Sequence, residues 1–63
     1  MHSNTIQAIN FLRDQPSLFQ TSIYYLIKRF KIDLPIPIVA QQLKLYSFIN
    51  VLKTDKSYLI VKR

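Results

Sequence analysis

Apolar residues in the first part of the chain recur at the spacing of an amphipathic helix. Asn4-Thr5-Ile6-Gln7 has the form of a capping box, in which Asn4 caps the helix and Gln7 bonds back to it. One broad apolar face follows, formed by Ile6, Ile9, Phe11 and Leu12. The predicted helix ends over residues 13–15, because the residue before Pro16 is disfavoured in helical geometry.

A second helix is predicted from Ser17 to Lys31. Ser17-Leu18-Phe19-Gln20 is again a capping-box pattern, and apolar residues follow it at helical spacing. We expect five of them to be mostly buried in the core: Phe19, Ile23, Leu26, Ile27 and Phe30. Lys28-Arg29-Phe30-Lys31 is expected to end the helix, where cations interact favourably with the negative end of the helix dipole.

Two prolines separate the second helix from a third. Residues 33–37 are predicted to be extended, since Leu34 and Ile36 each precede a proline. The third helix is expected to begin at Pro37, a favourable first-turn position. Its predicted inward residues are Val39, Leu43 and Tyr46, and its predicted outer residues are Gln41, Gln42 and Lys44.

The last part of the chain is predicted to be a β-hairpin. Residues 48–52 and 58–61 are β-branched and aromatic runs of strand length, and Thr54-Asp55-Lys56-Ser57 between them is typical of a turn. A fourth helix over residues 46–53 is the alternative. The pattern as a whole predicts one α+β domain over residues 1–63, with three helices and a C-terminal β-hairpin.

The apolar content is high for so short a chain. Apolar residues and Tyr make up 49% of 63 residues, and a domain of this size buries only about 60% of the surface that its unfolded chain exposes. We therefore expect an exposed apolar patch that a partner covers, and we expect a homodimer.

Membrane insertion and secretion are not expected. The longest apolar runs, residues 24–27 and 36–40, are far shorter than the ~20 residues of a membrane-spanning helix. The first residues lack the basic start and apolar stretch of a secretory signal. The expected location is the cytoplasm.

The residue types needed for catalysis are largely missing. The chain contains no Cys, no Glu and no Gly, and His2 is its one His. Its three Asp fall in separate predicted turns. Because catalysis and metal binding need convergent groups, we expect no enzymatic activity, no metal site and no cofactor.

Net charge is concentrated in the second half of the chain. Residues 1–27 contain Arg13 and Asp14, whereas residues 28–63 contain eight cations and two Asp, which accounts for the net charge of +6. Such asymmetry produces a positive field that attracts a polyanion. Nucleic acid is the favoured partner, with an acidic protein surface or simple solubility as alternatives.

The order helix, helix, proline-interrupted helix and basic hairpin resembles the winged-helix variant of helix-turn-helix DNA-binding domains. The resemblance covers about residues 4–63 as a pattern and rests on the segments Val39-Ala40-Gln41-Gln42-Leu43-Lys44-Leu45 and 51–61. It implies close helix packing at Ala40, a third helix in the DNA major groove and a hairpin wing on the backbone. It also implies a short first strand, for which residues 32–34 are the candidate.

Candidate contact residues follow from that resemblance. Gln41 and Gln42 would hydrogen-bond base edges, since a carboxamide matches adenine N6 and N7, although Gln is also simply a soluble helix former. The candidate phosphate contacts, which are otherwise a solvated surface, are Lys44, Lys53, Lys56, Lys62 and Arg63. Four tyrosines are candidates either for stacking on unpaired bases or for the edge of the core: Tyr24, Tyr25, Tyr46 and Tyr58.

The sequence thus predicts a small basic nucleic-acid-binding protein. The favoured ligand is duplex DNA, and the favoured role is a transcriptional regulator of phage or plasmid type that acts by occupancy. One alternative is a protein-interaction module or inhibitor that binds an acidic or apolar surface. Another is a small basic subunit of a large assembly such as a ribosome.

Overall fold

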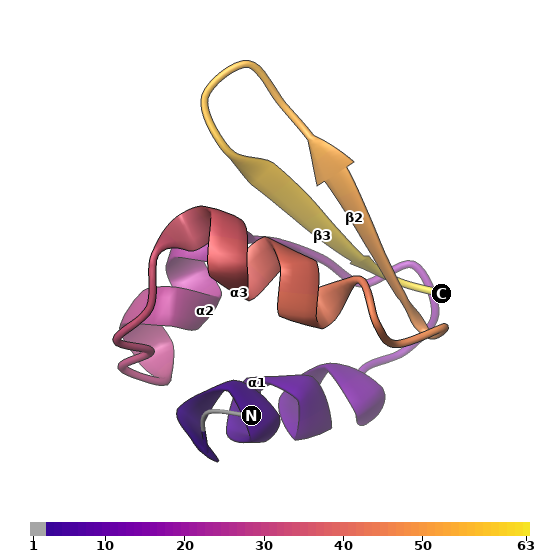
Figure 1. Ribbon diagram of the computed structural model, residues 1–63. Helices are drawn as coiled ribbons and strands as arrows, with labels where there is room; N and C mark the ends of the chain where they lie inside the picture. Colours follow the sequence, from indigo (N-terminus) through magenta and orange to yellow (C-terminus); the bar gives the residue numbers. More distant parts are fainter. Residues whose placement is uncertain (1–2) are drawn as a thin grey trace.

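Three helices pack against a three-stranded antiparallel sheet in the computed structural model, which describes residues 3–63 (Figure 1). The elements in chain order are α1 (Ser3–Arg13), β1 (Gln20–Ser22), α2 (Ile23–Arg29), α3 (Ile36–Leu43), β2 (Ile49–Lys53) and β3 (Tyr58–Lys62). The predicted α+β class, with three helices and a C-terminal hairpin, is confirmed. None of the helices in residues 3–63 has the length and apolar character that crossing a membrane requires.

The central strand of the sheet is the last one in the chain. β3 pairs with β2 along its full length and with β1 on its other side, so the strand order is β1-β3-β2. Ile60 of β3 lies opposite both Val51 and Thr21. Side chains alternate between faces along a strand, so Ile49 and Ile60 point into the core from the same face.

The first helix lies where the sequence predicts it, but its predicted cap is wrong. α1 includes Asn4, whose side-chain Nδ2 donates a hydrogen bond to the carbonyl oxygen of Lys31 at 2.9 Å. Asn4 therefore links the start of α1 to the end of α2. The buried stripe of α1 has helical spacing and consists of Thr5, Ala8, Ile9 and Leu12.

The predicted start of the second helix is also wrong. Residues 20–22 form β1, and Ser22 is the true N-cap of α2, with its Oγ accepting a hydrogen bond from the Tyr25 backbone N–H at 3.1 Å. Leu18 has a φ of 70°, which a right-handed helix does not allow. Pairing with β3 gives residues 20–22 backbone partners that an isolated helical turn lacks. The short first strand therefore lies here and not at residues 32–34.

The end of α2 agrees with the prediction and has a defined backbone motif. Lys31 adopts a φ of 52°, and the Ile32 N–H donates back to the Ile27 carbonyl at 3.0 Å. This is the Schellman arrangement, in which a left-handed residue closes the helix. Ile32 is buried, as the motif's apolar residue usually is.

Replacing Lys31 with Gly is expected to stabilise the protein by about 1 kcal/mol. A left-handed backbone costs a residue with a Cβ about 1–2 kcal/mol, and glycine avoids most of that cost although its unfolded chain is more flexible. Urea unfolding measures the change. The same substitution at Lys28, inside α2, should instead destabilise by about 1 kcal/mol. If Lys31→Gly and Lys28→Gly both destabilised the protein, the left-handed backbone at Lys31 would not be a source of strain that glycine relieves.

The third helix and the hairpin are close to their predicted positions. α3 begins at Ile36, one residue before the predicted start, with Pro35 at the N-cap position. The turn of the hairpin is closed by a hydrogen bond from the Thr54 N–H to the Ser57 carbonyl at 2.8 Å. The alternative of a fourth helix over residues 46–53 is wrong, because residues 49–53 pair with β3.

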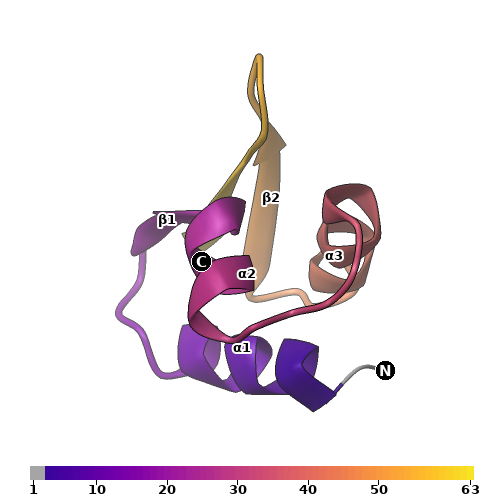
Figure 2. The ribbon, with the colours of Figure 1, turned by 90° about the vertical axis from the view of Figure 1, so that its left-hand side faces the viewer.

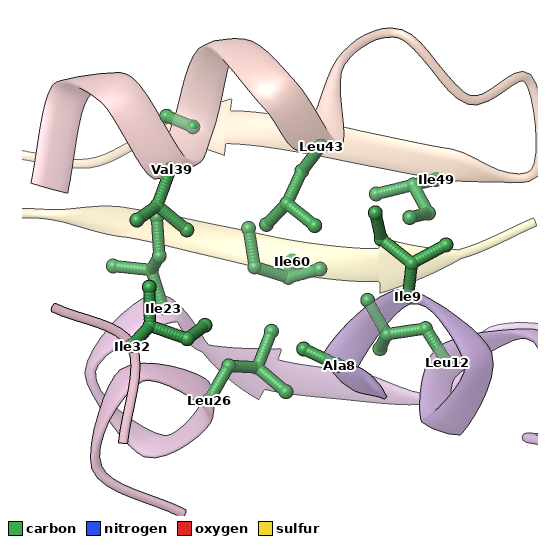
Figure 3. Packing of buried hydrophobic residues seen from close by; sticks show 11 residues of the cluster. Ala8, Ile9, Leu12, Ile23, Leu26, Ile32, Val39, Leu43, Ile49 and Ile60 are labelled. Carbon is green, nitrogen blue, oxygen red and sulfur yellow. The ribbon is translucent and has the colours of Figure 1, made fainter. Parts of the chain in front are cut away.

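The core lies between the helices and the inner face of the sheet (Figure 3). Its apolar side chains are Ala8, Ile9, Leu12, Ile23, Leu26, Ile32, Val39, Ala40, Leu43, Ile49 and Ile60. Ile23 and Leu26 are fully buried as predicted, but the other three predicted core residues are only half-buried: Phe19, Ile27 and Phe30. Two of these belong to an aromatic rim, in which Phe11 lies 5.9 Å from Phe19 and 5.5 Å from Phe30 between ring centroids.

Candidate nucleic-acid interface

The outer face of α3 is uncovered by the rest of the described chain. Val39, Ala40 and Leu43 fix the inner face of this helix, which leaves Gln41 exposed on the other side, together with the 38% exposed Ile38. Lys44 follows at the C-cap position and is also exposed. Figure 2 shows α3 on one side of the molecule, with the hairpin rising beyond the helices. This face offers one carboxamide, one ammonium and a small apolar surface.

Gln42 does not share the environment of Gln41. Its side chain is half-buried, and its Oε1 is buried without a hydrogen-bond partner. Adjacent helical residues point about 100° apart, so Gln42 lies between the outer face and the core. The two glutamines were predicted as a pair of base contacts, and the structure leaves Gln41 exposed and Gln42 half-buried.

The tip of the hairpin presents two free ammonium groups. Lys53, at the end of β2, and Lys56, in the turn, are both exposed. Neither ammonium has a hydrogen bond or an ion pair within residues 3–63. Asp55 lies between them in the sequence and is exposed as well, so these three residues have a net charge of +1.

Lys62 has a structural role that its place in the sequence did not suggest. Its Nζ donates hydrogen bonds to the carbonyl oxygens of Arg13 and Gln15, both at 2.8 Å, and lies 5.9 Å from the centroid of the Phe48 ring. The Arg13 guanidinium lies 5.2 Å from the same ring. Lys62 thus satisfies the carbonyl group of the last residue of α1 and that of Gln15 just after it, 49 and 47 residues away in sequence.

Arg63 is exposed but lies at the other end of the hairpin from the tip (Figure 1). Its backbone N–H donates to the Phe48 carbonyl at 2.9 Å, which extends the β2–β3 pairing by one residue. In Figure 2 the C-terminus and α3 lie on opposite sides of β2. The candidate residues therefore lie in three places. Gln41 and Lys44 belong to α3 and its C-cap, Lys53 and Lys56 to the hairpin tip, and Lys62 and Arg63 to the C-terminal end at the base of the hairpin.

The four tyrosines also divide into two groups. Tyr46 and Tyr58 are half-buried and pack against the core, while Tyr24 and Tyr25 of α2 are 52% and 46% exposed.

Over residues 3–63, no three His, Cys, Asp or Glu side chains come together as metal ligands would. No protein-family model, curated protein or solved structure matches the chain.

Proposed function

We propose that this protein is a winged-helix-like nucleic-acid-binding regulator that acts by occupying duplex DNA. The observation on which the proposal rests is the element order α1-β1-α2-α3-β2-β3 combined with the strand order β1-β3-β2. In the winged-helix domains that this order resembles, the third helix enters the major groove and the hairpin contacts the backbone. Here the outer face of α3 and the hairpin tip are the corresponding surfaces.

The charges on these surfaces favour backbone contacts over base recognition. Lys44, Lys53 and Lys56 are available for phosphates, whereas Gln41 is the one exposed glutamine on α3. Lys62 is bonded within the protein. We therefore expect about three phosphate contacts and a slope of log affinity against log salt of about −3 on duplex DNA. Sequence preference should be weak, since phosphate contacts contain no base information.

Salt titration of binding to a labelled DNA duplex tests this proposal. The double variant Lys53→Ala/Lys56→Ala should reduce the magnitude of the slope by nearly two units, because each lost phosphate contact removes about 0.9. Gln41→Ala should leave the slope unchanged and reduce preference among sequences.

A matched control removes the same charge elsewhere. Lys28→Ala/Arg63→Ala also lowers the net charge by two, but Lys28 lies on α2 and Arg63 follows β3, so neither residue belongs to α3 or to the hairpin tip. Its slope should stay close to that of the unmodified protein. If both double variants reduced the salt slope equally, the diffuse positive field of the protein, and not contact at the hairpin tip, would be responsible for the salt dependence of binding. The absence of salt-sensitive binding to duplex DNA, single strands and RNA at low ionic strength would refute the proposal.

Binding to an acidic or apolar protein surface is the second candidate function. The observation that favours it is the exposure of two large apolar side chains in loops, Leu18 and Leu45, each 74% exposed. The proposal of a homodimer rests on the same side chains. If the DNA titration fails as described above, this candidate replaces the first.

A further inference from the structure

The outer face of α2 combines exposed aromatic rings with cations. This seven-residue helix buries Ile23 and Leu26. On its solvent side, Tyr25, Lys28 and Arg29 line a hollow of about 260 Å³. These three residues have the spacing i, i+3 and i+4, which places their side chains next to one another on a helix. The hollow therefore has one aromatic wall and two positively charged ones.

Arg29 lies over two rings of the aromatic rim. Its guanidinium carbon lies 5.5 Å from the centroid of the Phe30 ring and 5.8 Å from that of Phe11. Stacking of this kind restrains a guanidinium while its N–H groups stay available to an acceptor. The side chain is thus positioned before any ligand arrives.

No carboxylate of residues 3–63 forms an ion pair at this end of α2, where Asp33 follows two residues after Lys31. Lys28, Arg29 and Lys31 follow one another closely, and none of them forms an ion pair with another described residue. The carbonyl oxygens of Leu26 and Ile27 accept hydrogen bonds from the residues that close the helix. Those bonds reduce the negative character that a helix end otherwise presents to an anion.

We propose that this hollow binds an unpaired nucleotide, with the base stacked on Tyr25 and the phosphate held by Lys28 and Arg29. An aromatic wall beside two cations matches a ligand that is both planar and anionic. An acidic peptide would pair with the cations but would leave the tyrosine ring exposed. The three lining residues all lie on α2, and none of them belongs to α3 or to the hairpin tip, so this site is separate from the proposed duplex interface and does not depend on it. Figure 2 shows α2 and α3 as separate helices.

The probe that tests this site is a labelled oligo-dT of about ten nucleotides, the length of a typical single-strand site. Fluorescence anisotropy should show binding that weakens with salt, at about −0.7 in the log–log slope for each phosphate contacted. Tyr25→Ala should weaken binding about tenfold, whereas Tyr25→Phe, which keeps the ring, should bind as the unmodified protein does. Lys28→Ala should reduce the slope by about 0.7.

Tyr24 provides the matched control. It is as exposed as Tyr25 but does not line the hollow, so Tyr24→Ala should change affinity less than twofold. The hairpin variant Lys53→Ala/Lys56→Ala should keep its affinity for oligo-dT, which separates this inference from the duplex proposal. Circular dichroism of each variant confirms that it is folded. The inference is overturned if oligo-dT does not bind, if Tyr24→Ala and Tyr25→Ala weaken it equally, or if only a labelled poly-Glu peptide binds through Tyr25.

Discussion

Truncating Leu26 to Ala should destabilise the protein by about 2–5 kcal/mol, the largest effect we expect from a single substitution. Leu26 is fully buried in α2 and lies among side chains from the other helices and the sheet (Figure 3). Its loss removes the transfer free energy of the side chain and leaves a cavity that a packed core fills only in part. A domain of this size has a free energy of unfolding of about 5 kcal/mol, so the variant should be largely unfolded at elevated temperature.

Leu45→Ala is the matched control for this change. The same atoms are removed, but Leu45 is 74% exposed, so the free energy of unfolding should change by less than about 0.5 kcal/mol. Urea unfolding followed by circular dichroism measures both variants. Similar effects at the two positions would contradict the burial of Leu26 in the core. Truncating Phe30 to Ala should destabilise the protein less than truncating Leu26, because Phe30, which the sequence predicted in the core, is half-buried in the aromatic rim.

Replacing Lys62 with Met should destabilise the protein by about 1–2 kcal/mol without reducing the salt dependence of DNA binding. Met keeps the length of the aliphatic chain but removes the ammonium, so the carbonyl groups of Arg13 and Gln15 lose a charged donor. A hydrogen bond to a charged group contributes about 1.5–3 kcal/mol, and the partial exposure of this site lowers that figure.

Lys56→Met gives the opposite pattern and serves as the control. Lys56 is exposed at the hairpin tip and has no partner within the described chain, so its loss should leave stability within about 0.5 kcal/mol. It should reduce the DNA salt slope by about 0.9. If Lys62→Met lowers the slope and leaves the unfolding midpoint in place, Lys62 contacts phosphate and its bonds to α1 are dispensable.

The cations that make up the net charge of +6 have different roles in the structure. Lys62 stabilises the end of α1, and the Arg29 guanidinium lies over two aromatic rings. Lys44, Lys53 and Lys56 are the cations that lie on the surfaces proposed for duplex contact. Net charge predicts attraction to a polyanion, but it does not say which cations are available for that contact.

The sequence by itself determined the elements whose signals are local. The end of α1 before Pro16, the closure of α2 at residues 28–31 and the hairpin with its turn at residues 54–57 all lie where it places them. Each depends on residues within a few positions of one another: a proline, a run of cations after an apolar stripe, or two β-branched runs around a polar turn. The exposure of Gln41 and the burial of Leu26 follow from helical periodicity in the same way.

Only the tertiary structure decided the features that join distant parts of the chain. Residues 17–20 have the local form of a helix start, yet residues 20–22 form a strand because β3, almost forty residues later, offers them backbone hydrogen bonds. Asn4 binds the end of α2, and Lys62 binds the end of α1, for the same reason: the fold brings unpaired carbonyl groups within their reach. Local propensity is worth a few tenths of a kcal/mol per residue, so a backbone partner supplied by the fold outweighs it.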